Sequence, residues 1–208
     1  MNEREGVTKY QLHFSRSAPL PAAQLAALNA WRTLLFQLGL IGQDPKRYGG
    51  VGFGNLSMRL VPGSLRFAVT GTQTGHLPTL DRMHYAIVTA CDAATNQLTA
   101  EGPIAPSSES LTHGQIYAFD ARVNFVFHVH APQLWRAAPR LGLPGTDESA
   151  EYGTPQMVSE VERLFRQSDL PQLGIFTMRG HEDGVVSFGA SAEEAGAVLL
   201  RQLALALH

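Results

Sequence analysis

The spacing of apolar residues predicts helices in five parts of the chain. Apolar side chains that recur every three or four residues mark one face of an amphipathic helix. This spacing occurs in residues 22–40, 111–119, 131–138, 154–167 and 191–208. Ser191 followed by Glu194 is a capping-box pattern that marks the start of the last helix. For the second helix we expect Ser108 to be the N-cap.

Short runs of β-branched and aromatic residues predict strands between these helices. The runs are bounded by glycine, proline and other turn-forming residues. They cover residues 55–60, 65–70, 86–89, 98–99, 124–130, 175–178 and 185–188. Strands interspersed with helices, with no repeat or linker, predict one mixed α/β layered domain rather than a regular parallel sheet. We assign this domain to residues 21–208 and treat residues 1–20 as an N-terminal extension.

The composition is that of a soluble globular protein. Hydrophobic residues make up 44% of the 208 residues and charged residues 16%, which are ordinary values. The net charge of -2 gives no reason to expect nucleic acid or a membrane surface as a partner. The single cysteine excludes an internal disulfide. Residues 1–5 are too charged for a signal peptide, and no apolar run has the length of a membrane span. We therefore expect a cytoplasmic protein.

An apolar strand that ends in two histidines is the most informative stretch of the chain. It reads Asn124-Phe125-Val126-Phe127-His128-Val129-His130-Ala131-Pro132. Side chains alternate between the faces of a strand, so His128 and His130 point the same way and lie roughly 6–7 Å apart. Two imidazoles at this spacing can share one metal ion. The pair is equally consistent with two polar residues at the end of a strand.

Glu109 and His181 are the residues that can complete a metal site. Glu109 begins the second predicted helix, and His181 stands in a glycine-bounded turn between the last two strands. Three histidines and one carboxylate form a reasonable Zn²⁺ set with an open coordination position. Spacing alone does not decide for a metal, because Glu109 can instead serve as a charge at a helix N-terminus. His181 can likewise be a solvated turn residue.

Six short motifs in a fixed order resemble those of the class II aldolase/adducin superfamily, which includes fuculose-phosphate and rhamnulose-phosphate aldolases. They are Gly54-Asn55-Leu56-Ser57, Thr72-Gln73-Thr74-Gly75, Pro106-Ser107-Ser108-Glu109, His128-Val129-His130, Tyr152-Gly153-Thr154 and Gly180-His181. Turn chemistry explains each motif singly, but not their joint order over most of residues 22–205. The resemblance implies a three-layer α/β/α fold with a central, mostly antiparallel sheet.

The resemblance also implies a role for each motif. His128, His130 and His181 correspond to the ligands of a divalent metal, usually zinc, and Glu109 corresponds to the general acid/base. A phosphate pocket is implied at Asn55, Ser57, Thr74, Gly75, Ser107 and Ser108. Hydroxyls, amides and backbone N–H groups are suitable neutral donors to phosphate oxygens.

One departure from the family pattern affects the third metal ligand. Family members usually have His-Gly after the strand, whereas this chain has His181-Glu182-Asp183-Gly184, which resembles a two-residue insertion. Asp183 can therefore supply the third ligand in place of His181, and Glu182 can act on substrate. His113 and His84 do not match ligand positions, so we expect structural or surface roles for them.

The function implied by the resemblance is a metal-dependent, aldolase-type lyase. Its substrate would be a small sugar phosphate or related hydroxy-ketone, cleaved through an enediolate. The same site is compatible with an epimerase or dehydratase of a pentulose phosphate, and the fold with a non-catalytic, adducin-like binding or assembly domain. Family members are commonly tetramers, so we expect a homo-oligomer in which Tyr152 or the loop 139–152 can contribute to a neighbouring active site.

Overall fold

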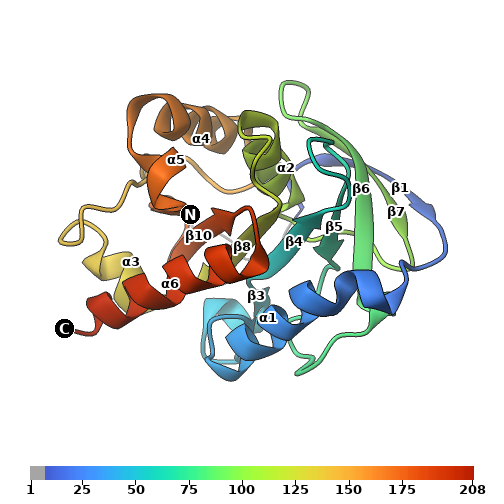
Figure 1. Ribbon diagram of the computed structural model, residues 1–208, viewed down its shortest axis with the longest axis horizontal. Helices are drawn as coiled ribbons and strands as arrows, with labels where there is room; N and C mark the ends of the chain where they lie inside the picture. Colours follow the sequence, from blue (N-terminus) through green and yellow to red (C-terminus); the bar gives the residue numbers. More distant parts are fainter. Residues whose placement is uncertain (1–7) are drawn as a thin grey trace.

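A single mixed sheet forms the centre of the computed structural model (Figure 1), which describes residues 8–208. Within these residues eight strands lie in the order β1-β7-β6-β5-β4-β8-β10-β9. Their bounds are β1 Gln11–Arg16, β4 Asn55–Arg59, β5 Phe67–Thr70, β6 Tyr85–Asp92, β7 Gln97–Gly102, β8 Phe125–His130, β9 Ile175–Thr177 and β10 Gly184–Gly189. Only the pair β1–β7 is parallel in this sheet. The expected mostly antiparallel sheet is confirmed.

The predicted helices are all present, with small differences at their ends. The helices are α1 Ala26–Gln37, α2 Ser110–Phe119, α3 Pro132–Ala137, α4 Pro155–Gln167, α5 Leu170–Leu173 and α6 Ala192–Ala206. A 3₁₀ turn, η1 Ala22–Leu25, precedes α1, and two more are η2 Tyr48–Gly50 and η3 Arg82–His84. The short strands β2 Gly42–Gln43 and β3 Gly52–Phe53 form a separate two-stranded ribbon.

Helices cover both faces of the sheet and give the molecule three layers (Figure 1). One apolar core lies between the sheet and the side that carries α2 and α4, and a second lies beneath α1, α3 and α6. Strand β8 contributes to both, because Val126 belongs to the first core and Phe127 and Val129 to the second. By the same alternation, His128 and His130 face the α2 side of the sheet.

The start of α2 differs from our expectation, because Ser108 is not its N-cap. Glu109 occupies the cap position without a side-chain hydrogen bond to the helix. Ser110, the first helical residue, donates its hydroxyl back to the carbonyl of Ser107 at 2.7 Å. The prediction failed because the helix begins one residue later than the preferred capping residue Ser108 would place it. At α6 the N-cap is confirmed, since Ser191 Oγ accepts from the N–H of Glu194. The Glu194 carboxylate accepts from the N–H of Ala190, so the second half of the capping box is not formed.

Part of the predicted N-terminal extension joins the sheet. Strand β1 pairs with β7 over six residues, and Tyr10, just before it, is buried in the first core. Residues 1–7, with the charged start that argued against a signal peptide, lie outside the described residues. The boundary at residue 21 therefore stays a prediction, and the sheet itself begins ten residues earlier, at Gln11.

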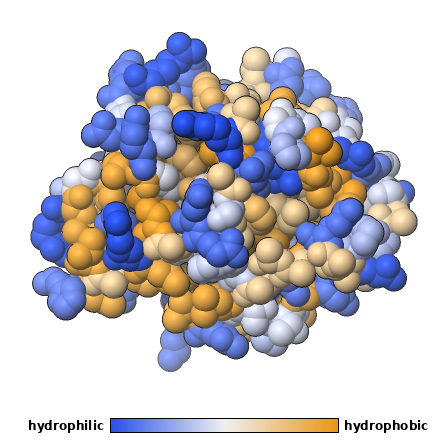
Figure 2. All heavy atoms as spheres, in the orientation of Figure 1, coloured by the Kyte–Doolittle hydropathy of each residue, from blue (hydrophilic) through white to orange (hydrophobic). Residues whose placement is uncertain are grey.

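The surface mixes apolar and hydrophilic side chains on the face shown in Figure 2. Among residues 8–208, no helix combines the length and the apolar character needed to cross a bilayer. Large apolar side chains that remain exposed include Leu34 and Leu38 at the end of α1, and Leu205 and Leu207 at the end of the chain.

Candidate metal centre and adjoining pocket

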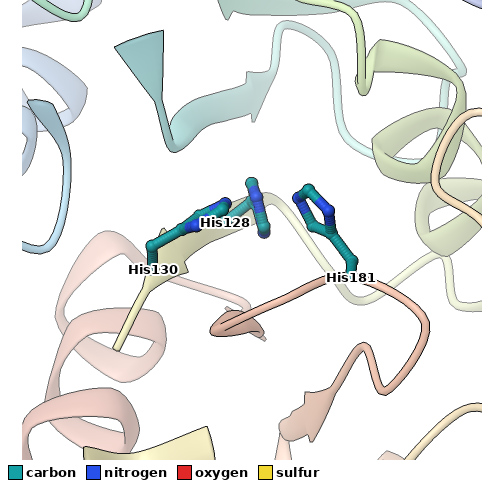
Figure 3. A group of neighbouring side chains, drawn as sticks. All are labelled: His128, His130 and His181. Carbon is teal, nitrogen blue, oxygen red and sulfur yellow. The ribbon is translucent and has the colours of Figure 1, made fainter. Parts of the chain in front are cut away.

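Three histidines converge at one end of the sheet (Figure 3). His128 and His130 project from the end of β8 on the same face, with ring centroids 5.1 Å apart. His181 comes from the turn between β9 and β10, and its ring lies 5.4 Å from that of His128 and 4.8 Å from that of His130. Each ring offers one nitrogen, and these nitrogens lie within 4.8 Å of one another. The three histidines can therefore hold one metal ion.

The turn that carries His181 is fixed by backbone pairing. Gly184, its last residue, lies opposite His130 in the β10–β8 ladder. The N–H of His181 donates to Met178, and the N–H of Gly184 donates to His181. A Cβ at position 184 would lie only 2.8 Å from the His181 ring, so the ring occupies space that only glycine leaves open. His181 therefore faces the other two histidines although Glu182 and Asp183 separate it from Gly184.

Glu109 brings a carboxylate to the histidines. Its Oε1 lies 2.9 Å from Nε2 of His128 and 3.5 Å from Nε2 of His181. Burial by itself raises the pKa of Glu109, but the opposing effect of His128 and His181 is larger and holds it well below its usual range. Burial, together with the other two imidazoles, lowers the pKa of His130 well below its usual range. A neutral imidazole and an ionised carboxylate are the forms that bind metals.

The donor set fits a divalent transition metal. All four residues are at most 1% exposed, and Glu109 Oε2 has no hydrogen-bond partner within the described chain. A buried carboxylate oxygen left in this state costs free energy unless a further partner satisfies it. Three converging imidazoles, with a carboxylate beside two of them, suit zinc, although manganese, iron and cobalt accept the same ligands.

Asp183 is the alternative to His181 as third metal ligand, and Glu182 is the residue that could act on substrate. The Asp183 carboxylate accepts a 2.7 Å hydrogen bond from the hydroxyl of Tyr48, and it does not belong to the group of converging donors. Glu182 is exposed on the outside of the turn.

Five of the six residues implied in phosphate binding line a single pocket beside the metal centre. They are Asn55, Thr74, Gly75, Ser107 and Ser108. The pocket adjoins the histidines in two ways. Asn55 lies opposite His128 in the β4–β8 ladder, and Ser108 directly precedes Glu109.

Ser57, the sixth residue, lies outside this pocket. It shares a face of β4 with Asn55, but at its position α2 covers the sheet. Its Oγ lies 2.6 Å from His113 Nδ1 and 2.8 Å from the hydroxyl of Tyr117, and the side chain is fully buried. Ser57 and His113 thus form an interior hydrogen-bonded group, which agrees with the structural role expected for His113. His84 caps the short turn η3, outside the metal centre.

Several polar groups of the pocket have no hydrogen-bond partner within the described chain. Among the hydrogen bonds of the described residues, the backbone N–H groups of Gln73, Thr74 and Gly75 have no acceptor. Gln73 adopts a positive φ of 56°, and successive N–H groups in such a turn form a concave anion site. Asn55 Oδ1 also lacks a partner there. No carboxylate lines the pocket, so an anion meets no direct repulsion from its walls.

Aromatic residues enclose the histidines, and the sequence singled out only one of them, Tyr152. Tyr48 and Phe53 pack against the His130 ring, with centroids 4.5 and 5.4 Å away. Tyr152 is fully buried, and its ring lies 4.7 Å from His181 of the same chain. Tyr48 has a φ of 48°, a conformation that is uncommon for a bulky residue. The glycine-rich surroundings of Tyr48 were the available signal, but they gave no indication of which side chain would face the site.

Comparison with solved structures identifies the fold. The chain aligns with L-fuculose-1-phosphate aldolase from Thermus thermophilus at a TM-score of 0.64 and 19% identity, over 90% of this chain and 92% of that one. A sugar-phosphate aldolase from Thermotoga maritima gives 0.64 and 15%, over 89% and 94% of the two chains. The protein YgbL from Klebsiella pneumoniae, whose description leaves its activity open between aldolase, epimerase and decarboxylase, gives 0.64 and 18%, over 90% and 89%. The search of curated protein sequences found no match.

Comparison with protein families agrees with these structural neighbours. The family described as Class II Aldolase and Adducin N-terminal domain matches residues 45–202. The match includes strand β8, the turn that carries His181, the pocket, and most of α6. This chain belongs to the class II aldolase and adducin N-terminal domain family.

Proposed function

We propose that the protein is a metal-dependent, aldolase-type lyase that cleaves a small sugar phosphate or a related hydroxy-ketone. The observation that carries the proposal is the adjacency of two sites of different chemistry. A cluster of three buried histidines lies at the end of β8, and a pocket of hydroxyl and N–H donors adjoins it through Asn55 and Ser108. A phosphorylated carbonyl compound has one end suited to each site.

In this proposal His128, His130 and His181 hold the ion. A bound divalent ion supplies Lewis-acid polarisation of carbonyl and hydroxyl oxygens. Zinc is our first choice because the donors are mainly imidazoles.

Glu109 is the group that we assign to proton transfer. Its carboxylate lies within hydrogen-bond distance of His128. In the chain, Glu109 directly follows Ser108, which lines the pocket. Cleavage of the carbon–carbon bond requires that the hydroxyl proton of one fragment be removed and that the enediolate carbon of the other fragment receive a proton. A single carboxylate beside both positions can accept the first proton and return it in the second step.

The pocket residues hold the phosphate in this proposal. Asn55, Thr74, Gly75, Ser107 and Ser108 remain assigned to it, whereas the interior hydrogen bonds of Ser57 support a structural role. Binding of a remote phosphate orients the reacting end of a substrate and lowers the entropic part of the barrier.

A second reaction class uses the same residues. The description of YgbL joins epimerase and decarboxylase to aldolase, and the epimerase or dehydratase alternative needs the same proton transfer at Glu109. The non-catalytic, adducin-like alternative has less support, since all three histidines and Glu109 converge. A homo-oligomer and a cytoplasmic location stay expectations.

A panel of ketose phosphates, scored by product identity, tests the proposal. Aldol cleavage yields two carbonyl fragments, whereas epimerisation or dehydration keeps the carbon skeleton intact. For the substrate that turns over, Glu109→Gln should lower kcat by roughly 10²–10⁴-fold. Glu101→Gln is the matched control. Glu101 lies on β7, which is not next to β8 in the sheet, and it forms an ion pair with Arg66. Unchanged turnover in Glu109→Gln would contradict the assigned role.

A further inference from the structure

Arg32 is a buried cation that the metal centre does not use. It lies in α1 with 1% of its surface exposed. Its Nη2 donates to the carbonyl of Thr74 at 3.0 Å, and its Nη1 donates to the carbonyl of Leu77. Its guanidinium stands over the ring of Phe36, 4.9 Å from the centroid. Both hydrogen-bond acceptors belong to the turn that lines the pocket.

A guanidinium in this position has a substantial desolvation cost. Within residues 8–208 no carboxylate pairs with Arg32, so two carbonyl dipoles and an aromatic face are its principal compensation. Burial lowers the pKa of Arg32, yet an arginine side chain remains protonated in proteins. A leucine or methionine would fill the same space in α1 without this cost, so core packing alone does not explain the residue.

The contact with Thr74 constrains the next backbone donor. A trans peptide unit is planar, so the carbonyl of Thr74 and the N–H of Gly75 point in opposite directions. With the carbonyl held by Arg32, the Gly75 N–H is turned away from α1. Gly75 lines the pocket, and its N–H is one of the three without an acceptor in the described chain.

Gly75 itself leaves no room for the turn to adjust. A Cβ at this position would overlap the carbonyl of Gly42 and lie 2.8 Å from Gly52 Cα. The turn is therefore packed against the β2–β3 ribbon on one side and held by Arg32 through its carbonyls. These restraints fix its donors before any anion arrives, which is the condition for tight binding by backbone N–H groups.

We propose that Arg32 is a positioning residue for the phosphate pocket. It orients the turn of residues 72–77 through the carbonyls of Thr74 and Leu77, and it adds a positive charge behind the N–H groups that receive the anion. This inference rests on the phosphate pocket of the proposed function.

Arg59 provides a matched control. It is also a buried arginine, 5% exposed, whose donors bind the carbonyls of Val123, Tyr117 and Asp120. Its guanidinium stands 4.7 Å from the ring centroid of Tyr117. It therefore has the same chemistry as Arg32 but supports the end of α2 instead of the pocket.

The test measures the affinity of the zinc-incubated full chain for inorganic phosphate by calorimetry. The variants are Arg32→Gln, Arg32→Lys and Arg59→Lys. A fourth variant, Ser108→Ala, shows whether the phosphate that is measured binds in the pocket. Thermal unfolding and metal content are recorded for each protein. Arg32→Lys keeps the charge and one donor, so it is the milder change if Arg32→Gln does not fold.

We expect Arg32→Gln to raise the Kd for phosphate at least about tenfold and Arg32→Lys about fivefold, as expected for loss of charge-assisted hydrogen bonds behind the site. Metal content should stay at the wild-type value in both. Arg59→Lys should lower the melting temperature but change the Kd less than about twofold.

The outcomes separate the inference from the proposed function. Wild-type affinity in the Arg32 variants, with reduced affinity in Ser108→Ala, would overturn the role of Arg32 and leave the pocket intact. Equal weakening by Arg32→Lys and Arg59→Lys would overturn it as well, since a general loss of stability would then explain both. Absence of phosphate binding in the wild type, or binding that Ser108→Ala does not change, would overturn the pocket and the inference together.

Discussion

Asn55 of β4 lies directly opposite His128 of β8 in the antiparallel ladder of the central sheet. Paired residues of adjacent strands are close neighbours, with Cα atoms about 4.5–5.5 Å apart. The pocket and the metal centre therefore share one end of the sheet, and neither can move relative to the other without breaking the ladder. The distance between the pocket and the metal centre is therefore fixed for any substrate that binds both.

This spacing predicts how loss of a pocket residue affects turnover. Ser108→Ala should raise KM for a phosphorylated substrate about tenfold or more, because a hydrogen bond to a charged group is lost. For the unphosphorylated analogue, KM and kcat should change less than about twofold. Steady-state kinetics on both compounds measure this difference. Ser159→Ala, at an exposed position of α4 whose hydroxyl only bonds Pro155, is the control and should match the wild type.

Two buried serines predict opposite effects on stability. Ser57 Oγ bonds both His113 and Tyr117. Ser57→Ala therefore removes the partner of His113 Nδ1 and leaves the Tyr117 hydroxyl only its 3.5 Å bond to the carbonyl of Asn124, which should cost about 1–3 kcal/mol. Ser187 Oγ is buried with no partner in the described chain, so Ser187→Ala should be neutral or stabilising. Urea unfolding measures both.

The Ser57→Ala variant also tests whether Ser57 lies outside the phosphate pocket. Phosphate affinity should be unchanged in Ser57→Ala when the protein is folded. A large loss of phosphate affinity without loss of stability would return Ser57 to the pocket and contradict the interior assignment.

Alternation along strands made much of the site predictable. His128 and His130 lie on one face of β8, as the period of two requires. The same rule set Asn55 and Ser57 on one face of β4, but it could not show that α2 covers Ser57 and stops short of Asn55. The extent of a covering helix depends on tertiary packing, which the strand's own sequence does not contain.

Three other features were beyond what residue spacing predicts. The meeting of His181 with the β8 histidines depends on the register of β10, and residue spacing does not fix the register. Strand β1 was not predicted, because the alternation in Gln11–Arg16 includes only two apolar residues, Leu12 and Phe14, and its four polar residues are exposed. The contact of Arg32 with the turn joins residues 42 positions apart and has no signature in the α1 sequence.

Strand β1 brings a further support to the pocket through Tyr10. The Tyr10 hydroxyl donates to the carbonyl of Ser107 at 2.8 Å. Tyr10→Phe should reduce the free energy of unfolding by about 1 kcal/mol and weaken phosphate binding a few-fold, since the Ser107–Ser108 peptide loses one restraint. Chemical unfolding and phosphate titration measure the two effects.

Tyr85→Phe separates the two effects of the Tyr10 variant. Tyr85 is also buried, and its hydroxyl donates to Asn29 at 2.9 Å, away from the pocket. This variant should lose similar stability and keep wild-type phosphate affinity. If both tyrosine variants bind phosphate equally well, Tyr10 serves stability alone.

Metal content of the purified protein tests the central claim most directly. Elemental analysis should find about one divalent ion per chain in the wild type and in His84→Ala, whose imidazole caps η3. His128→Ala should lose the ion, because two imidazoles hold it far more weakly than three. An ion-free wild type, even after incubation with zinc, or equal metal content in His128→Ala, would contradict the account.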